Sequence, residues 1–168
     1  MKLLSDRMAM ELENLMGMCF VGNRIADRAQ SQLKVKFVMP ITGDIVHLQF
    51  AHKMPLVADQ IADYCDSRNY AVNYPATPKD YTDYSNTKEV FDKLLEYMLD
   101  LEKQTGNVME LALAERDKMT YKFLNDFLMG LNEYTKMMLS FVDYIETNGY
   151  TPKDNRMMDY SIKKFLKK

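Results

Sequence analysis

The stretch NYAVNYPATPKDYTDYS, residues 69–85, decides the fold that we expect for this chain. It contains Pro75 and Pro78 and shows no helical period, whereas the sequence on either side of it does. Its 17 residues are long for a connection inside a compact domain, where connections typically have about 4–6 residues. We therefore expect this segment to cross the length of a helical bundle.

The sequence before this stretch begins with one long helix. Ser5 is a suitable N-cap, and the helix is expected to run to about Gln32. Its apolar residues recur at steps of three and four, which is the period of a helix with one buried face. They are Met8, Leu12, Leu15, Met16, Cys19, Phe20 and Ala26.

A second helix is expected over residues 45–68. Residues 33–44 contain Pro40 and Gly43, and we interpret them as the connection between the two helices. Pro55 lies inside the second helix, where proline removes a backbone donor. A kink or a late helix start is therefore expected there.

The sequence after residue 85 predicts two more long helices. Asn86 and Glu89 form a capping-box pair, and no proline follows before Glu146. A single helix of that length would measure about 90 Å, so the segment must fold back on itself. The polar residues 115–118 offer the best turn.

The C-terminal part predicts a short fifth helix. The Asn148-Gly149 pair ends the fourth helix, and Thr151-Pro152 begins a helix that extends to Lys168. The expected fold is therefore all-α: one domain over residues 1–168, with four long helices, a long crossover between the second and third, and a short fifth helix.

Composition narrows the class of protein. The net charge of −2 gives no general attraction to nucleic acid or acidic lipid, and Lys163, Lys164, Lys167 and Lys168 are explained as a cationic helix end. Two cysteines are too few for a disulfide framework, and no stretch is long and apolar enough to span a membrane. We expect a cytoplasmic protein without membrane or nucleic-acid partners.

The surplus of 15 Met and 11 Tyr favours a homo-oligomer, because both residue types are enriched at interfaces.

Two glutamates interrupt apolar helix faces. Glu102 lies within the stripe formed by Phe91, Leu95, Met98, Thr105 and Met109, and Glu13 stands one turn from Met16. An unpaired buried carboxylate costs several kcal/mol, so it needs a partner or a metal ion. Either Glu13 is a half-exposed edge residue and Glu102 pairs with a buried polar side chain, or both face the bundle axis as parts of a metal site.

At this point the sequence resembles the ferritins. The similar stretches are Leu101-Glu102-Lys103, FLNDFL at 123–128, Tyr64 with DSRN at 66–69, MMDY at 157–160, and Glu13 seven residues before Phe20. The resemblance covers nearly the whole chain. It implies a ferritin-like bundle that forms a closed homo-oligomeric cage and handles iron.

The chain departs from that family at its expected di-iron site. The resemblance places the Glu and His of the second-helix E-x-x-H motif at Met54 and Val57. It places a fourth-helix Glu–Gln pair at Gly130 and Leu131. We therefore expect an impaired ferroxidase centre, with enzymatic activity only where the remaining carboxylates still bind two irons.

The remaining metal-ligand candidates are Glu13, Glu102 and Glu133, the last at the position of an accessory iron ligand in some bacterial ferritins. They allow weak iron binding. Haem is not expected, because Met54 is one residue away from the haem-binding methionine of bacterioferritins. His47 and His52 are five residues apart and are not expected to share a helix face. Two hypotheses therefore stay open: an iron-handling ferritin-like subunit, or a ferritin-like shell, scaffold or partner-binding protein without an iron role.

Overall fold

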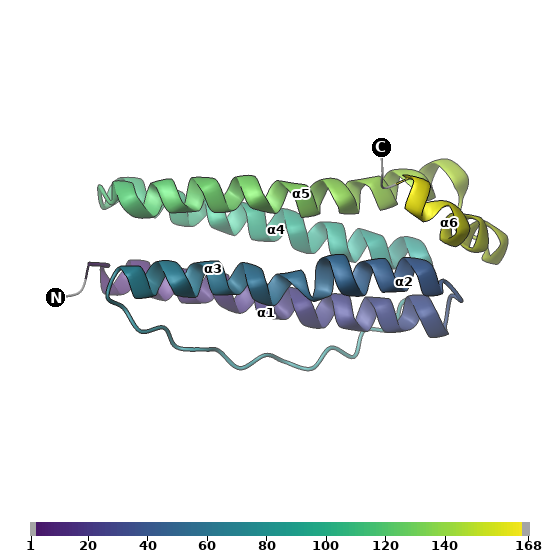
Figure 1. Cartoon of the computed structure of the whole chain (residues 1–168), viewed down its shortest axis with the longest axis horizontal. Helices are drawn as coiled ribbons and strands as arrows, with labels where there is room; N and C mark the ends of the chain where they lie inside the picture. Colours follow the sequence, from purple (N-terminus) through teal and green to yellow (C-terminus); the bar gives the residue numbers. More distant parts are fainter. Residues whose placement is uncertain (1–2, 166–168) are drawn as a thin grey trace.

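The bundle consists of two antiparallel helix pairs, joined by a long extended segment (Figure 1). This computed structural model describes residues 3–165. Within them the elements are α1 (Asp6–Val35), α2 (Pro40–Val46), the π-helix η1 (His47–Ala51), α3 (Lys53–Ser67), α4 (Thr87–Ala114), α5 (Lys118–Asn148) and α6 (Pro152–Phe165). The described part contains no strand, so the all-α prediction is confirmed.

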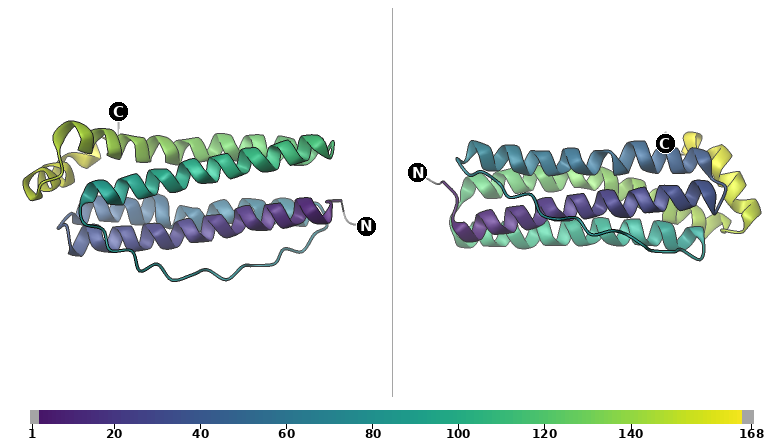
Figure 2. Two further views of the ribbon diagram at one scale, coloured as in Figure 1. Left: turned by 180° about the vertical axis from the view of Figure 1, so that it is seen from behind. Right: turned by 90° about the horizontal axis from the view of Figure 1, so that it is seen from below.

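The crossover lies along the outer side of α1 for most of the length of the bundle (Figure 2). Near its start, Tyr70 donates to Glu13 on α1 at 3.0 Å. Near its end, Arg28 donates to the carbonyl oxygen of Thr82 at 2.7 Å. The crossover thus has no secondary structure of its own, and side chains of α1 hold it at both ends.

The predicted helix starts are confirmed by their caps. Ser5 Oγ accepts from the backbone N–H of Met8 at 3.0 Å, and Asn86 Oδ1 accepts from that of Glu89 at 3.0 Å. The turn between α4 and α5 lies within residues 115–118, as expected. The fifth helix begins at Pro152 as predicted, and its expected end at residues 166–168 lies outside the described residues.

The expected connection at residues 33–44 is wrong. Helix α1 continues to Val35, and α2 already begins at Pro40. Proline is tolerated at the first position of a helix, where its missing N–H is not needed, so Pro40 starts a helix here. The carboxylate of Asp159, from α6, accepts from the backbone N–H groups at the start of α2, which the local sequence does not reveal.

The second bundle helix contains one π-turn. The backbone N–H of His52 donates to the carbonyl oxygen of His47 at 3.0 Å, which is an i to i+5 bond. Because of this extra residue the two imidazole rings meet, with centroids 4.1 Å apart. The expectation that these histidines occupy different faces is therefore wrong. Helix α3 follows from Lys53, so the irregularity expected near Pro55 is this π-turn and not a late start of the helix, which begins at Pro40.

Buried side chains from all four long helices fill the bundle. Phe91 and Phe141 stack with ring centroids 4.6 Å apart, and they join α4 to α5. Tyr64 and Phe123 are half-buried, stack with ring centroids 4.1 Å apart, and join α3 to α5. Across residues 3–165, no helix has the length and apolarity that spanning a membrane requires.

Candidate metal centre

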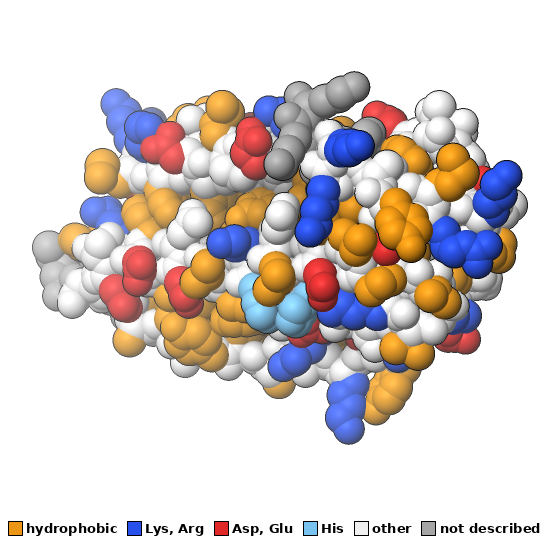
Figure 3. Space-filling model, turned by 45° about the vertical axis from the view of Figure 1, so that its right-hand side comes forward, with side chains coloured by type: hydrophobic (Ala, Val, Ile, Leu, Met, Phe, Trp, Pro, Cys, Tyr) orange, Lys and Arg blue, Asp and Glu red, His pale blue; other side chains and the backbone are white. Residues whose placement is uncertain are grey.

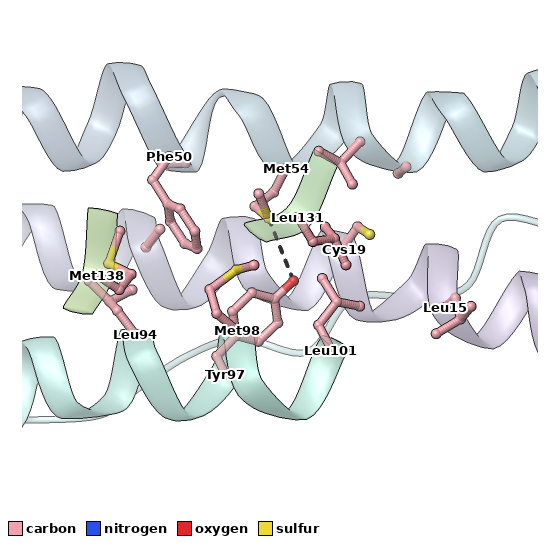
Figure 4. Packing of buried hydrophobic residues seen from close by; sticks show 14 of the residues in the cluster. Leu15, Cys19, Phe50, Met54, Leu94, Tyr97, Met98, Leu101, Leu131 and Met138 are labelled. Carbon is pink, nitrogen blue, oxygen red and sulfur yellow. Dashed lines mark hydrogen bonds between the residues drawn. The ribbon is translucent and has the colours of Figure 1, made fainter. Parts of the chain in front are cut away.

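Apolar side chains occupy the middle of the bundle (Figure 4). Cys19 of α1, Met54 of α3 and Met98 of α4 are fully buried, and Leu131 of α5 is 1% exposed. These side chains come from four different helices and lie around the bundle axis. The space between the helices is therefore an apolar core, and three of these four side chains contribute a sulfur atom to it.

One tyrosine contributes the polar atom that Figure 4 shows in this region. The hydroxyl of Tyr97 donates to the carbonyl oxygen of Met18 at 3.1 Å and lies 3.6 Å from Met54 Sδ. Gly22 makes room for it, because a Cβ atom there would lie 2.2 Å from the hydroxyl. We did not select Tyr97 from the sequence. The signal in the sequence was Gly22, a glycine in the interior of a long helix, which leaves room for a large side chain such as that of Tyr97.

Burial keeps the ionisable groups of this region neutral. Burial raises the pKa of the Cys19 thiol to about 12. It also raises the pKa of Tyr97 well above the ordinary tyrosine value. Thiolate, not thiol, binds metal ions well, so Cys19 is a poor ligand at neutral pH. The centre of the bundle is therefore uncharged.

The four positions that the resemblance assigns to the di-iron site hold no oxygen or imidazole side chain. Met54 and Leu131 pack in the core, and Val57 is 4% exposed. Gly130 is exposed on α5. Carboxylate and imidazole are the donors that a di-iron site of this fold uses. The side chains present do not fit such a site.

Glu13 contacts the crossover. Its Oε1 accepts from the Tyr70 hydroxyl at 3.0 Å, from the backbone N–H of Asn73 at 2.7 Å and from the Asn73 side chain at 2.9 Å. The side chain is half-buried. These three bonds agree with the hypothesis of an edge residue, and they give Glu13 a structural role in holding residues 70–73.

Glu102 and Glu133 lie in two other environments. Glu102 is half-buried on α4, and its Oε1 accepts a short hydrogen bond from the Thr135 hydroxyl of α5. Glu133 is exposed and pairs with Lys136 at 3.0 Å. The structure thus gives Glu13, Glu102 and Glu133 three different sets of partners. No three His, Cys, Asp or Glu residues within 3–165 form a group that could hold a metal ion.

Comparison with known proteins gives consistent results. The family model of the ferritin-like domain matches residues 51–152. A bacterial non-heme ferritin of Staphylococcus saprophyticus is 28% identical over 103 residues, which are 61% of this chain and 62% of that protein. The matched region thus spans less than two thirds of the relative.

Solved ferritin structures share the fold. An open pore ferritin of the hyperthermophilic archaeon Archaeoglobus fulgidus superposes with a TM-score of 0.86, at 17% identity, over 96% of this chain and 97% of that one. A closed form of the ferritin from the same organism, engineered by site-directed mutagenesis, gives a TM-score of 0.83 at 16% identity, over 94% and 95% of the two chains.

Proposed function

Because this chain belongs to the ferritin-like domain family, we propose that it is an iron-storage subunit of a homo-oligomeric cage that lacks a working ferroxidase centre. The family match and the ferritin relative support the storage role. We place the protein in the cytoplasm, in agreement with its composition.

The apolar centre of the bundle supports the second part of the proposal, that the subunit lacks a working ferroxidase centre. A ferroxidase site must bind two ferrous ions about 3.5–4 Å apart and transfer electrons from both to oxygen. In this chain Met54 and Leu131 occupy that region, and neither side chain supplies a hard oxygen donor or an imidazole. The ligands that a site needs for fast oxidation of two paired iron ions are therefore missing.

Weak iron binding at separate carboxylates remains part of the proposal. Glu102 keeps one oxygen beyond its bond to Thr135, and Glu133 is exposed on α5. The Oε1 atom of Glu13 already accepts from the backbone N–H of Asn73 in the crossover. Each of the three can hold at most one loosely bound ion, because they have separate partners.

Exposed apolar side chains support the oligomer. Leu48 and Leu56 of the second bundle helix are 56% and 54% exposed, and Tyr81 of the crossover is 77% exposed. Met129 of α5 is 67% exposed. Exposed apolar groups of this size are typical of surfaces that another subunit covers.

The experiment combines solution mass with iron loading. We expect a closed multimer by light scattering. After anaerobic addition of Fe(II) followed by air, we expect ferric absorbance to develop slowly. Two irons bound per chain and oxidised within seconds, with the activity lost in Glu13→Ala or Glu102→Ala, would contradict the proposal. Lys122→Ala, which removes only the exposed ion-pair partner of Asp126 on α5, serves as the matched surface control.

The groove between α1, α4 and the crossover favours a second candidate, a shell or partner-binding protein without an iron role. It has a volume of about 760 Å³ and is lined in part by Val21, Ile25 and Pro75. Iron loading separates the two candidates. A multimer that retains mineral iron after gel filtration supports storage, and one that retains none supports the second candidate.

A further inference from the structure

Carboxylates outnumber lysines in the groove between α1, α4 and the crossover. The groove adjoins a shallow second cavity of about 400 Å³, because Lys93 and Glu96 line both. Two lysines and five carboxylates line the two cavities, and the carboxylates are Glu13, Glu89, Asp92, Glu96 and Asp100. On the face of the bundle that carries the two histidines, acidic and basic side chains are instead interspersed (Figure 3). The groove is therefore a place where negative charge gathers.

Four of these carboxylates form a stripe along α4. Glu89, Asp92, Glu96 and Asp100 follow one another at steps of three, four and four residues, which is the spacing of one helix face. At 1.5 Å per residue, the stripe is about 16 Å long. Its two middle members have lysine partners, since Asp92 pairs with Lys88 at 2.8 Å and Glu96 pairs with Lys93 at 2.9 Å.

The two ends of the stripe bond only to neutral donors within residues 3–165. Glu89 accepts from the backbone N–H of Ser85 at 2.8 Å and from the side-chain amide of Asn86 at 3.2 Å. Asp100 accepts from the side-chain amide of Gln104 at 3.2 Å. Neither carboxylate is neutralised by a cation. The stripe thus offers two positions for a positively charged group, about 16 Å apart along α4.

A buried hydroxyl at the Glu89 end lacks a hydrogen-bond partner. Tyr84 of the crossover is 3% exposed and lines the second cavity together with Glu89. Its hydroxyl bonds to no atom of the described residues. Burial, with a smaller contribution from Asp80, raises the pKa of Tyr84 to about 12, so this group is a neutral hydroxyl. An unpaired buried hydroxyl is unfavourable, and a ligand that donates to it would remove that cost.

Apolar side chains line the groove beside the stripe. Val21 and Ile25 come from α1, Leu99 from α4 and Pro75 from the crossover. Methylene groups gain free energy when they leave water for such a surface, whereas a hydrated metal ion does not. The lining therefore matches a chain-like molecule in which methylene groups separate the positive charges.

We propose that this groove binds a linear aliphatic polyamine. One ammonium group pairs with Asp100, another pairs with Glu89, and the methylene chain lies against the apolar wall. An ammonium group has three donors, so the one at Glu89 also donates to the Tyr84 hydroxyl. Extended spermine is long enough to reach both ends of the stripe, and 1,4-diaminobutane reaches only one. This binding does not depend on the role in iron storage.

Calorimetric titration of the whole protein with spermine, at low ionic strength, tests the proposal. We expect one spermine per chain, bound at least tenfold more tightly than 1,4-diaminobutane. Asp100→Asn and Glu89→Gln should each weaken binding several-fold. Lys103→Gln should strengthen it, because Lys103 lines the groove and repels the ligand. Glu110→Gln removes an exposed charge of α4 outside the groove, so this matched control should bind as the wild type does.

Tyr84→Phe separates a binding role of the hydroxyl from a structural one. Because the hydroxyl has no partner, its removal should leave the melting temperature unchanged or raise it. The same variant should bind spermine several-fold more weakly. Unchanged affinity in both Tyr84→Phe and Asp100→Asn would overturn the proposal. Equal losses in Glu110→Gln and Asp100→Asn, or equal affinities for spermine and 1,4-diaminobutane, would show attraction to surface charge alone and would also overturn it.

Discussion

Asp159 Oδ1 accepts hydrogen bonds from both the backbone N–H and the hydroxyl of Thr42, at 2.6 and 2.8 Å. Its Oδ2 accepts from the backbone N–H of Ile41 at 3.3 Å. The residue that precedes α2, Met39, supplies no side-chain cap. A carboxylate from α6 therefore caps α2, and its charge is favourable at a helix N-terminus.

Asp159→Ala should lower the free energy of unfolding by about 2–3 kcal/mol, because it leaves buried donors without an acceptor. Urea unfolding measures this change. Tyr160→Ala is the control on the same helix, since Tyr160 is 83% exposed, and it should change stability by less than about 0.5 kcal/mol. Equal stability of the two variants would show that the Asp159 cap contributes little.

Glu13→Ala should release the start of the crossover, because residues 70–73 lose a shared acceptor. We expect trypsin to cut at the exposed Lys79 several-fold faster than in the wild type, with the helical circular dichroism unchanged. Glu11→Ala, two residues away on α1, is the control. Cleavage at the same rate in both variants would contradict a clamping role for Glu13.

The buried thiol of Cys19 should make the protein less stable in alkali. Its pKa is raised from 9.0 to about 12, so above pH 9 the unfolded chain loses a proton that the folded chain retains. The free energy of unfolding then falls by about 1.4 kcal/mol per pH unit for this group up to about pH 12. Urea unfolding at pH 8, 9 and 10 should show that the free energy of unfolding falls by about 1 kcal/mol less in Cys19→Ala than in the wild type between pH 9 and pH 10. An equal pH dependence of the free energy of unfolding in the wild type and in Cys19→Ala would contradict this prediction.

Met54→Leu tests whether the buried sulfur atom has a role in iron handling. The substitution conserves volume, so it should cost less than about 1.5 kcal/mol. The iron-loading rate should not change, because the Met54 sulfur lies beside the Tyr97 hydroxyl inside the core. A loading rate reduced tenfold, in a variant with a normal melting temperature, would identify Met54 as an iron ligand.

Glu102→Gln should leave the stability within about 0.5 kcal/mol of the wild type, because the amide oxygen can still accept from Thr135. Thr135→Val removes the donor and serves as the paired variant. The melting temperature measures both. A strongly destabilised Glu102→Gln would mean that the charge of this carboxylate, rather than its acceptor oxygen, is required.

Local signals in the sequence were sufficient for much of the fold. Ser5, Asn86 and the turn at 115–118 act through neighbours three or four residues away, so their patterns predict where helices begin and end. Pro40 was misinterpreted because its helix is capped by Asp159, more than a hundred residues later in the chain. Proline marks a helix break or a helix start, and only the tertiary contact distinguishes them here.

The candidate site was predictable to a smaller extent. The apolar residues at Met54 and Leu131 followed from the ferritin resemblance. The partner of Glu102 did not, since Thr135 is a common residue on another helix. The meeting of His47 and His52 was also missed, because a period of 3.6 residues per turn was assumed where the helix contains a π-turn.

The crossover also determines the order in which the chain can fold. Residues 36–39 join α1 to the second bundle helix (α2, η1 and α3), and residues 115–117 join α4 to α5. Because both connections are short, each helical hairpin can form by local contacts. Contacts between the hairpins, such as Tyr97 with Met54, must wait for a 19-residue loop, 68–86, to close. Folding should therefore proceed as two fast helical hairpins followed by a slower docking step, and the crossover sets the entropy cost of that step.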